Sequence, residues 1–170
     1  EMDASGEFDA GVDANHDASE DAGEPATSCT HNQTCIDVLG PYHICHHQRG
    51  TCVSLLSEHC TEVVGDYANG DALLLGSIGP STGPNESTGL SNLWGIKLAV
   101  QDFTLVANGL PPVESGGRRP IVVVHCDDRS NSDQAVAGAK HLANEVVVSA
   151  IIGPSFSGIT LTVASKVTIP

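Results

Sequence analysis

Three short apolar runs stand out in the second half of the chain, each followed by a polar, glycine-containing stretch. The runs are Ala72–Ser77, Ile121–His125 and Val146–Ile152. Continuous runs of this length, rich in Val, Ile and Leu, are typical of strands buried on both faces of a parallel sheet. The stretches between them are long enough to hold a crossover helix. The pattern therefore predicts an α/β fold, with an open parallel sheet and flanking helices.

A helical pattern follows each predicted strand. The predicted helices are Ser91–Asn108, Asp133–Asn144 and a third from Ser157 to about Ala164. Ser132 or Asn131 would cap the second helix, since both residue types are favoured at that position. Val167–Pro170 then reads as the approach to a further strand. We therefore expect the chain to hold only part of a larger fold.

Residues 1–28 differ sharply in composition from the rest. They contain nine acidic residues and no Lys or Arg, and such a segment buries too little apolar surface to become ordered. We predict a disordered acidic tether here. The net charge of −14 argues against nucleic-acid and anionic-lipid partners, which need clustered Lys and Arg. No apolar run approaches the roughly 20 residues of a membrane span.

A second unit, residues 29–66, is rich in cysteine and poor in apolar residues. Its cysteines are Cys29, Cys35, Cys45, Cys52 and Cys60. A module this small needs disulfides or a metal to fold. One economical arrangement makes two pairs within the module and joins Cys60 to Cys126, at the end of the second apolar run. The spacing alone leaves the pairing open.

Zinc is the alternative for this unit, because histidines lie among the cysteines. They are His31, His43, His46, His47 and His59. However, there is no C-x2-C pair, and His46 and His47 are adjacent rather than three to five residues apart, so zinc spacing is not met. We therefore favour disulfides over zinc or free thiols, and with them an oxidising, extracytoplasmic compartment.

Candidate binding residues lie in the loops after the predicted strands, where ligands of open α/β sheets bind. These loops are Gly76–Gly89, Cys126–Ser132 and Gly153–Gly158. The third suits an anion best, since Ser155 and Ser157 carry hydroxyls and the amides from Ser157 onward open a helix. The plainer interpretation is that Ser157 only caps its own helix.

Other candidate chemistry is weak. Asp127-Asp128 could hold Mg²⁺, but we expect the pair to face solvent or cap the following turn. His125 and His141 are isolated, which favours a structural or surface role. The first loop lacks the G-x-G-x-x-G dinucleotide fingerprint, and no G-x-S-x-G or H-E-x-x-H arrangement occurs in the α/β part. We therefore expect no catalytic residues, no cofactor and no metal.

Four segments in order carry a family resemblance. They are Leu75–Gly83, Gly95–Asp102, Asp127–Val136 and Ala150–Ser157. With them, Ala72–Pro170 resembles the first part of the N-terminal lobe of type I periplasmic binding proteins, the branched-chain amino acid (Leu/Ile/Val) receptors of ABC transporters. We accordingly divide the chain into the tether 1–28, the module 29–66 and a partial lobe 67–170.

The resemblance implies a two-lobed clamshell that captures a solute without catalysis. The ligand's carboxylate would meet the Ser157 hydroxyl and the amides from Gly158 on, and Thr88 and Gly89 would close one side. The solute would be an amino acid or a similar small carboxylate, and the partner the membrane component of an ABC transporter. The tail and module resemble the spacer that follows the lipid anchor of an envelope lipoprotein, with a signal already removed.

The chain also departs from the family pattern. No aromatic residue occurs between Ser77 and Leu93, where family members often carry one, and Ser130 and Phe156 replace cysteines that form a disulfide in some members.

Two other functions stay open. The same fold could be the sensory ectodomain of a receptor, or an enzyme with a flavodoxin-like fold, although the latter needs a phosphate-binding loop or catalytic group that is not visible.

Overall fold

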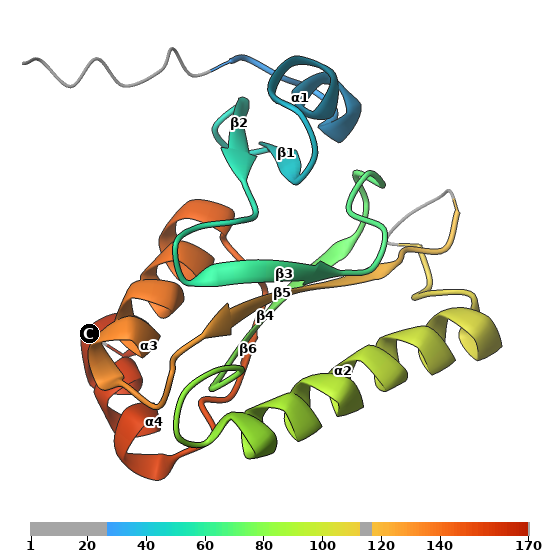
Figure 1. Cartoon of the computed structure of the whole chain (residues 1–170). Helices are drawn as coiled ribbons and strands as arrows, with labels where there is room; N and C mark the ends of the chain where they lie inside the picture. The colour runs from blue at the N-terminus through green and yellow to red at the C-terminus, as the bar shows by residue number, and fades with distance from the viewer. Residues whose placement is uncertain (1–26, 113–116, 170) are drawn as a thin grey trace, which may run out of the picture.

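The computed structural model describes residues 27–112 and 117–169, so the predicted tether falls almost wholly outside the described part. A small N-terminal subdomain lies against one end of a larger α/β unit (Figure 1). The helical elements are α1 (Asn32–Leu39), α2 (Glu86–Ala107), α3 (Ser132–Lys140), η1 (His141–Val146), α4 (Ser157–Val163) and η2 (Ala164–Thr168), where η marks π-helical turns. The strands are β1 (His43–His46), β2 (Thr51–Ser54), β3 (Cys60–Val64), β4 (Leu73–Gly79), β5 (Ile121–Asp127) and β6 (Ile151–Ile152).

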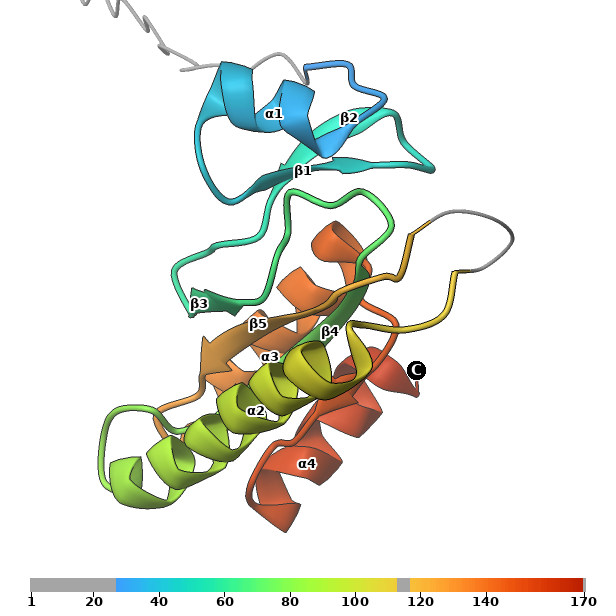
Figure 2. The ribbon, with the colours of Figure 1, turned by 90° about the vertical axis from the view of Figure 1, so that its right-hand side faces the viewer.

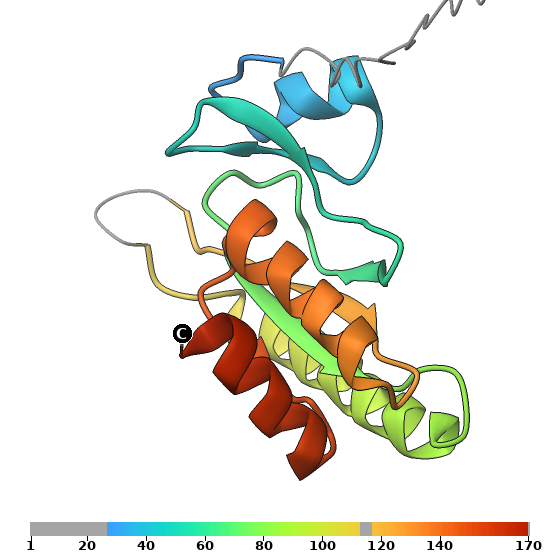
Figure 3. The same cartoon turned by 90° about the vertical axis from the view of Figure 1, so that its left-hand side faces the viewer.

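The main sheet has the order β3-β5-β4-β6. β4 pairs in parallel with β5 and β6, whereas β3 runs antiparallel to β5. α2 lies on one face of the sheet, and α3 and α4 lie side by side on the other (Figures 1 and 3). The predicted α/β class with a parallel sheet and flanking helices is confirmed, with one antiparallel edge strand added.

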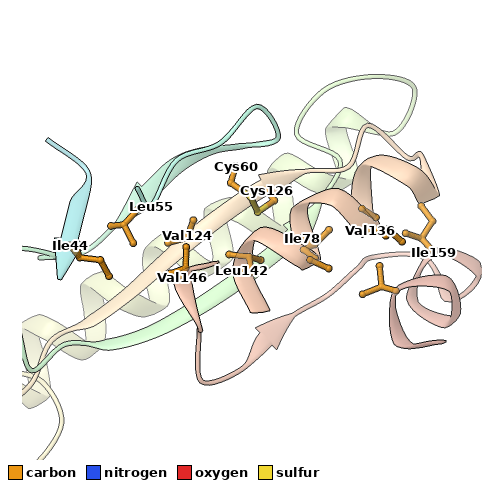
Figure 4. Close-up of a cluster of buried hydrophobic side chains, with 13 residues drawn as sticks. Ile44, Leu55, Cys60, Ile78, Val124, Cys126, Val136, Leu142, Val146 and Ile159 are labelled. Atoms are coloured by element: carbon orange, nitrogen blue, oxygen red, sulfur yellow. A yellow bond between two sulfur atoms is a disulfide. The ribbon is translucent and has the colours of Figure 1, made fainter. Parts of the chain in front are cut away.

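The main core lies between the sheet and the α3–α4 face. Ile78 and Val124 from the sheet belong to one cluster with Leu142, which is fully buried, and with Ile159 from α4, which lies near Val136 (Figure 4). Ile44 and Leu55 of the N-terminal subdomain belong to the same cluster and pack near Val146. The subdomain is therefore packed onto the α/β unit by apolar contacts as well as by the chain connection.

Three disulfides hold the cysteine-rich segment. They are Cys29–Cys45, Cys35–Cys52 and Cys60–Cys126. The economical arrangement, with two pairs inside the module and one to the second apolar run, is the one that the structure has. The Cys35–Cys52 bond ties α1 to β2, and the Cys29–Cys45 bond ties the segment before α1 to β1. These bonds compensate for the small number of apolar side chains there.

β3 connects the two parts of the molecule. Its residue Cys60 lies opposite Cys126 in the register with β5, and Glu62 forms an ion pair with Lys97 of α2. Although the sequence placed this segment in the cysteine-rich module, β3 is an edge strand of the main sheet. The boundary between residues 66 and 67 stays a prediction.

The first predicted helix begins earlier than expected. α2 starts at Glu86 rather than Ser91, and β4 continues to Gly79. The loop between them is therefore Pro80–Asn85, and Thr88 and Gly89 lie in the first turns of the helix. The polar residues of 86–89 hid this start, because a helix end needs few apolar positions.

The third predicted strand is much shorter than Val146–Ile152. The helical path continues from α3 through η1 to Val146, which is buried like Leu142 one turn earlier. Val147 then takes a left-handed conformation with φ of 58°. The strand β6 comprises Ile151 and Ile152, and just before it the N–H of Ser149 and the carbonyl of Ala150 also bond to β4. The segment Val146–Ile152 thus contains the end of a helix, then a turn, and then a short strand.

Of the residues that the sequence predicts as the approach to a further strand, Val167 and Thr168 belong to a helical segment. Ala164–Thr168 continues α4 as the π-helical segment η2, and Pro170 lies outside the described residues. Within the described ranges, none of the helices combines the length and the apolar character that crossing a membrane requires.

Candidate functional site

The loops that follow β4, β5 and β6 meet at the carboxyl edge of the sheet, where α2, α3 and α4 begin. Figure 2 shows the starts of α2 and α4 at the lower end of the molecule. We call this region the binding edge, defined by the loops Pro80–Asn85, Asp128–Asn131 and Gly153–Phe156. Open parallel sheets bind their ligands at this edge.

A cleft of about 440 Å³ opens between the end of β4, the first half of α2 and the Gly153–Phe156 loop. Its polar lining includes Ser77, Ser91, Asn92, His125 and Ser155. Two of the predicted binding residues, Gly89 and Ser155, line this cleft. Thr88, Ser157 and Gly158 do not line it, and all three are exposed at the starts of α2 and α4.

Ser155 links the third loop to α2. Its Oγ accepts a hydrogen bond from Nδ2 of Asn92 at 3.2 Å. A Cβ at Gly79 would lie 3.2 Å from the same oxygen, so the small residue at the end of β4 gives Ser155 its place. Asn92 was not among the residues that the sequence singled out.

Ser157 is the first residue of α4, and the N-cap position belongs to Phe156, which makes no side-chain cap bond. The interpretation that Ser157 only caps its own helix is therefore wrong in its geometry. A Cβ at Gly158 would meet nothing within 4 Å. Ser157 and Gly158 at this helix start are both exposed.

Gly89 is placed by close contact with the loop before α2. A Cβ at this position would collide with the backbone carbonyl of Pro80, so only glycine lets the first turn of α2 lie against the loop. Any change in the path of Pro80–Asn85 must therefore move Gly89 and its neighbour Thr88.

Asp127, at the end of β5, is 8% exposed, so it does not face solvent as the sequence suggested. Its Oδ1 accepts hydrogen bonds from the backbone N–H of Ser81 (2.9 Å), Thr82 (3.2 Å) and Arg129 (3.0 Å), and the Thr82 hydroxyl donates to Oδ2. Burial alone would raise the pKa of Asp127, but these hydrogen bonds outweigh it and lower the pKa below its usual value. The carboxylate is thus held in its charged form.

Asp128 is fully buried. Its Oδ1 accepts the N–H of Ser130 at 2.8 Å, whereas Oδ2 has no hydrogen-bond partner among the described residues. Burial raises its pKa, and the nearby charge of Asp127 adds to that effect. Both aspartates cap the turn that follows, as expected: Oδ1 of Asp127 accepts the N–H of Arg129, and Oδ1 of Asp128 accepts the N–H of Ser130.

His125 is a buried member of the same network. Its Nδ1 lies 2.7 Å from Oγ of Ser77, and its Nε2 lies 3.2 Å from Oγ of Ser81. Burial lowers its pKa, against a smaller opposite effect of Glu62 and Asp127. Since both ring nitrogens face hydroxyls and the Asp127 carboxylate bonds loop amides, the groups do not form a Ser-His-Asp relay.

The pairing of Ser77 with His125 follows from strand register, because the two are Cα partners on β4 and β5. The sequence treated His125 as isolated; aligning the two apolar runs in parallel would have brought the residues together. His141, the other isolated histidine, is buried as well and contacts Glu145 and the carbonyl of Leu55. Both histidines have structural contacts.

Within the ranges 27–112 and 117–169, one group of three side chains brings metal-ligand atoms within 4.8 Å of one another, namely Cys29, Cys35 and Cys45. All three sulfurs belong to disulfides, so none is the thiolate that zinc requires. The zinc alternative does not fit this arrangement.

Comparison with known proteins shows which family the α/β unit matches. Residues 73–168 match the family described as periplasmic binding protein. No curated protein sequence matches the chain.

Solved structures of branched-chain amino acid and related binding proteins are similar to the same part. LivJ of Streptococcus pneumoniae, a branched-chain amino acid transporter substrate binding protein in complex with isoleucine, is 26% identical, with 57% of this chain and 26% of that chain covered and a TM-score of 0.51. The leucine binding protein LivK of Thermotoga maritima is 26% identical (55% and 24% covered, TM-score 0.45). An ABC transporter solute binding protein of Rhodopseudomonas palustris, in complex with 3,4-dihydroxybenzoic acid, is 25% identical (56% and 24% covered, TM-score 0.47).

The chain spans about a quarter of the length of these solved relatives. The family match covers more than half of the chain and includes every strand of the parallel part of the sheet, together with α2, α3 and α4. Through residues 73–168, the chain belongs to the periplasmic binding protein family.

Proposed function

We propose that the chain takes part in the capture of a small carboxylate-bearing solute, such as an amino acid, for an extracytoplasmic ABC-type uptake system. Capture is by binding, without catalysis. The observation that carries this proposal is the family match over residues 73–168. The isoleucine complex of the Streptococcus pneumoniae relative supports the ligand class.

The contact with the ligand would be made at the binding edge. The carboxylate would accept hydrogen bonds from the Ser157 hydroxyl and from the amides at the start of α4, where unpaired N–H groups favour negative charge. Ser155 lies on the adjoining cleft, and Thr88 and Gly89 stand across the edge at the start of α2. The Ser157 hydroxyl has no partner among the described residues, so a ligand need not displace one.

We expect binding by this chain to be weak, because Ser155, Ser157 and Gly158 are exposed and water competes for each hydrogen bond. The test is a titration of the isotope-labelled chain with L-isoleucine, followed by amide chemical shifts. The expected result is saturable change at residues 155–159 and 88–89, with a Kd on the order of 1 mM. L-isoleucinamide, which lacks the carboxylate, should produce little change.

Ser157→Ala should raise the Kd about tenfold or more, as expected for loss of a hydrogen bond to a charged group. Ser165→Ala, on the exposed part of η2, is the matched control and should leave the Kd unchanged. Equal binding of isoleucine and isoleucinamide, or shifts confined to other parts of the chain, would show that the binding edge does not hold a carboxylate.

A further inference from the structure

The carboxylate of Asp127 joins two loops of the binding edge. It lies at the end of β5, but two of its backbone partners, Ser81 and Thr82, belong to the loop after β4 and are 45–46 positions away in the sequence. Its third backbone partner, Arg129, lies in its own loop. With the Thr82 hydroxyl, the side chain accepts four hydrogen bonds, which is close to the capacity of an ionised carboxylate.

Further contacts hold the Pro80–Asn85 loop to β5 and to the loop that follows β5. Nδ2 of Asn85 donates to Oγ of Ser130 at 2.9 Å, and His125 reaches Oγ of Ser81. Gly83 takes a positive φ of 85°, and a Cβ there would lie 3.2 Å from the carbonyl oxygen of Arg129. The Pro80–Asn85 loop therefore lies directly on the end of β5, and Asp127 supplies the charged acceptor at its centre.

The path of this loop fixes the start of α2. The N–H groups of Thr88 and Gly89 both bond to the carbonyl of Asn85, and Gly89 touches the carbonyl of Pro80. A loop that loses its hydrogen bonds to Asp127 would no longer hold Pro80 and Asn85 in place. Thr88 and Gly89, which lie across the binding edge from Ser157, would then move.

We propose that Asp127 is a positioning residue for ligand binding, which holds the Pro80–Asn85 loop so that Thr88 and Gly89 face the ligand. The part that concerns the ligand rests on the proposed function. The carboxylate has no free oxygen pointing at the ligand, because loop amides and a hydroxyl occupy both of its oxygens. Asp127 therefore contributes to ligand binding by holding the loop, not by touching the ligand.

Two substitutions of Asp127 test how strongly its side chain holds the Pro80–Asn85 loop. Asp127→Ala removes every acceptor, whereas Asp127→Asn keeps one carbonyl oxygen that can still accept from Ser81 and Thr82. We expect hydrogen-exchange protection of the Thr82 amide to fall at least about tenfold in the alanine variant, with a smaller fall in the asparagine variant and a smaller fall at Ser81, whose N–H also bonds to the carbonyl of Gly79. Protection in α4 should stay unchanged in both. Asp133→Ala is the control, because that side chain is 91% exposed in the first turn of α3.

The second measurement is the isoleucine titration of the same variants. The Kd should rise in the order wild type, Asp127→Asn, Asp127→Ala, with a change of about tenfold in the last. Unchanged protection at Ser81 and Thr82 in Asp127→Ala would overturn the role of Asp127 in the loop. A loosened loop with an unchanged Kd would overturn its role in binding. Absence of isoleucine binding by the wild-type chain would instead count against the proposed function, and the exchange measurement would still decide whether Asp127 holds the loop.

Discussion

Cys60 and Cys126 lie directly opposite each other on β3 and β5 and are joined by a disulfide. The bond connects the edge strand that leaves the cysteine-rich segment to the centre of the main sheet. α3 lies over it, since a Cβ at Gly138 would stand 2.9 Å from Cβ of Cys126 and 3.8 Å from Sγ of Cys60. The disulfide thus joins the strand that leaves the N-terminal subdomain to the sheet covalently, and α3 packs against this bond.

Removal of this disulfide should destabilise the whole α/β unit. The bond closes a loop with a sequence separation of 66 residues, for which chain entropy predicts a loss of about 4 kcal/mol in the free energy of unfolding. Cys60→Ala/Cys126→Ala, studied by urea denaturation, tests this. Cys29→Ala/Cys45→Ala is the comparison: it should loosen amides of α1 and β1 in hydrogen exchange and affect β5 far less. Equal effects of both pairs on β5 would contradict the distinction.

Two helical glycines should respond to alanine with opposite signs. Gly95 has open space around the position of a Cβ, so Gly95→Ala should raise the free energy of unfolding by about 0.5–1 kcal/mol through helix propensity. Gly138→Ala gains the same propensity, but its methyl group would force α3 away from Cys126, and we expect a net loss of about 1–3 kcal/mol. Denaturation midpoints measure both; a stabilised Gly138→Ala variant would mean that α3 does not pack tightly on the disulfide.

Acidification should weaken the fold through His125. Because burial lowers the pKa of this imidazole below its unfolded value of 6.5, the unfolded chain binds a proton first as the pH falls. The stabilisation from neutral His125 is therefore complete above about pH 6.5 and is lost as the pH falls through the folded pKa, with a limiting slope of about 1.4 kcal/mol per pH unit.

The variant His125→Gln should have a smaller slope of unfolding free energy against pH in the range below 6.5. His31→Gln, at an exposed position, serves as the control and should keep the wild-type slope. If His125→Gln and the wild type had parallel curves between pH 7.5 and 5, titration of His125 would not contribute to acid sensitivity.

Association of the chain with itself should depend on the outer edge of β6. Ile152 there is 45% exposed, and among the described residues β6 pairs on one side only, so its other side offers backbone groups to another copy. The net charge of −14 opposes contact between copies, and association should therefore increase with salt. Sedimentation velocity should show less association for Ile152→Lys, whereas Leu105→Lys, 74% exposed on α2, should have little effect.

Sequence reasoning worked where the pattern was local. β4 and β5 were found as apolar runs, and Asn131 was a candidate cap whose side chain indeed accepts the N–H groups of Asp133 and Gln134. The run Val146–Ile152 was misread because Val and Ile favour strands, while burial of Val146 beside Leu142 favours continuation of the helix. Tertiary packing decided the outcome over β propensity.

The site was less accessible to prediction because its contacts join distant segments. Ser155, proposed from its loop position, and Gly89, implied by the family resemblance, both line the cleft, but Asn92, Ser77 and the loop contacts of Asp127 depend on how segments align across 45 or more residues. From the sequence, Asp127 and Asp128 were expected to face solvent or to cap the following turn, with Mg²⁺ as the alternative. The fold instead places the N–H groups of Ser81 and Thr82 within reach of the carboxylate.

The antiparallel strand β3 makes the two edges of the main sheet unlike each other. Among the described residues, the outer strands are β3, which a disulfide joins to β5, and β6, which pairs with β4 through two residues. Contact of β6 with β6 uses the same surface on both copies, so an oligomer built in this way closes at two copies. Contact of β6 with β3 of the next copy leaves one open edge at each end, and of the two arrangements only this one can propagate into a fibre.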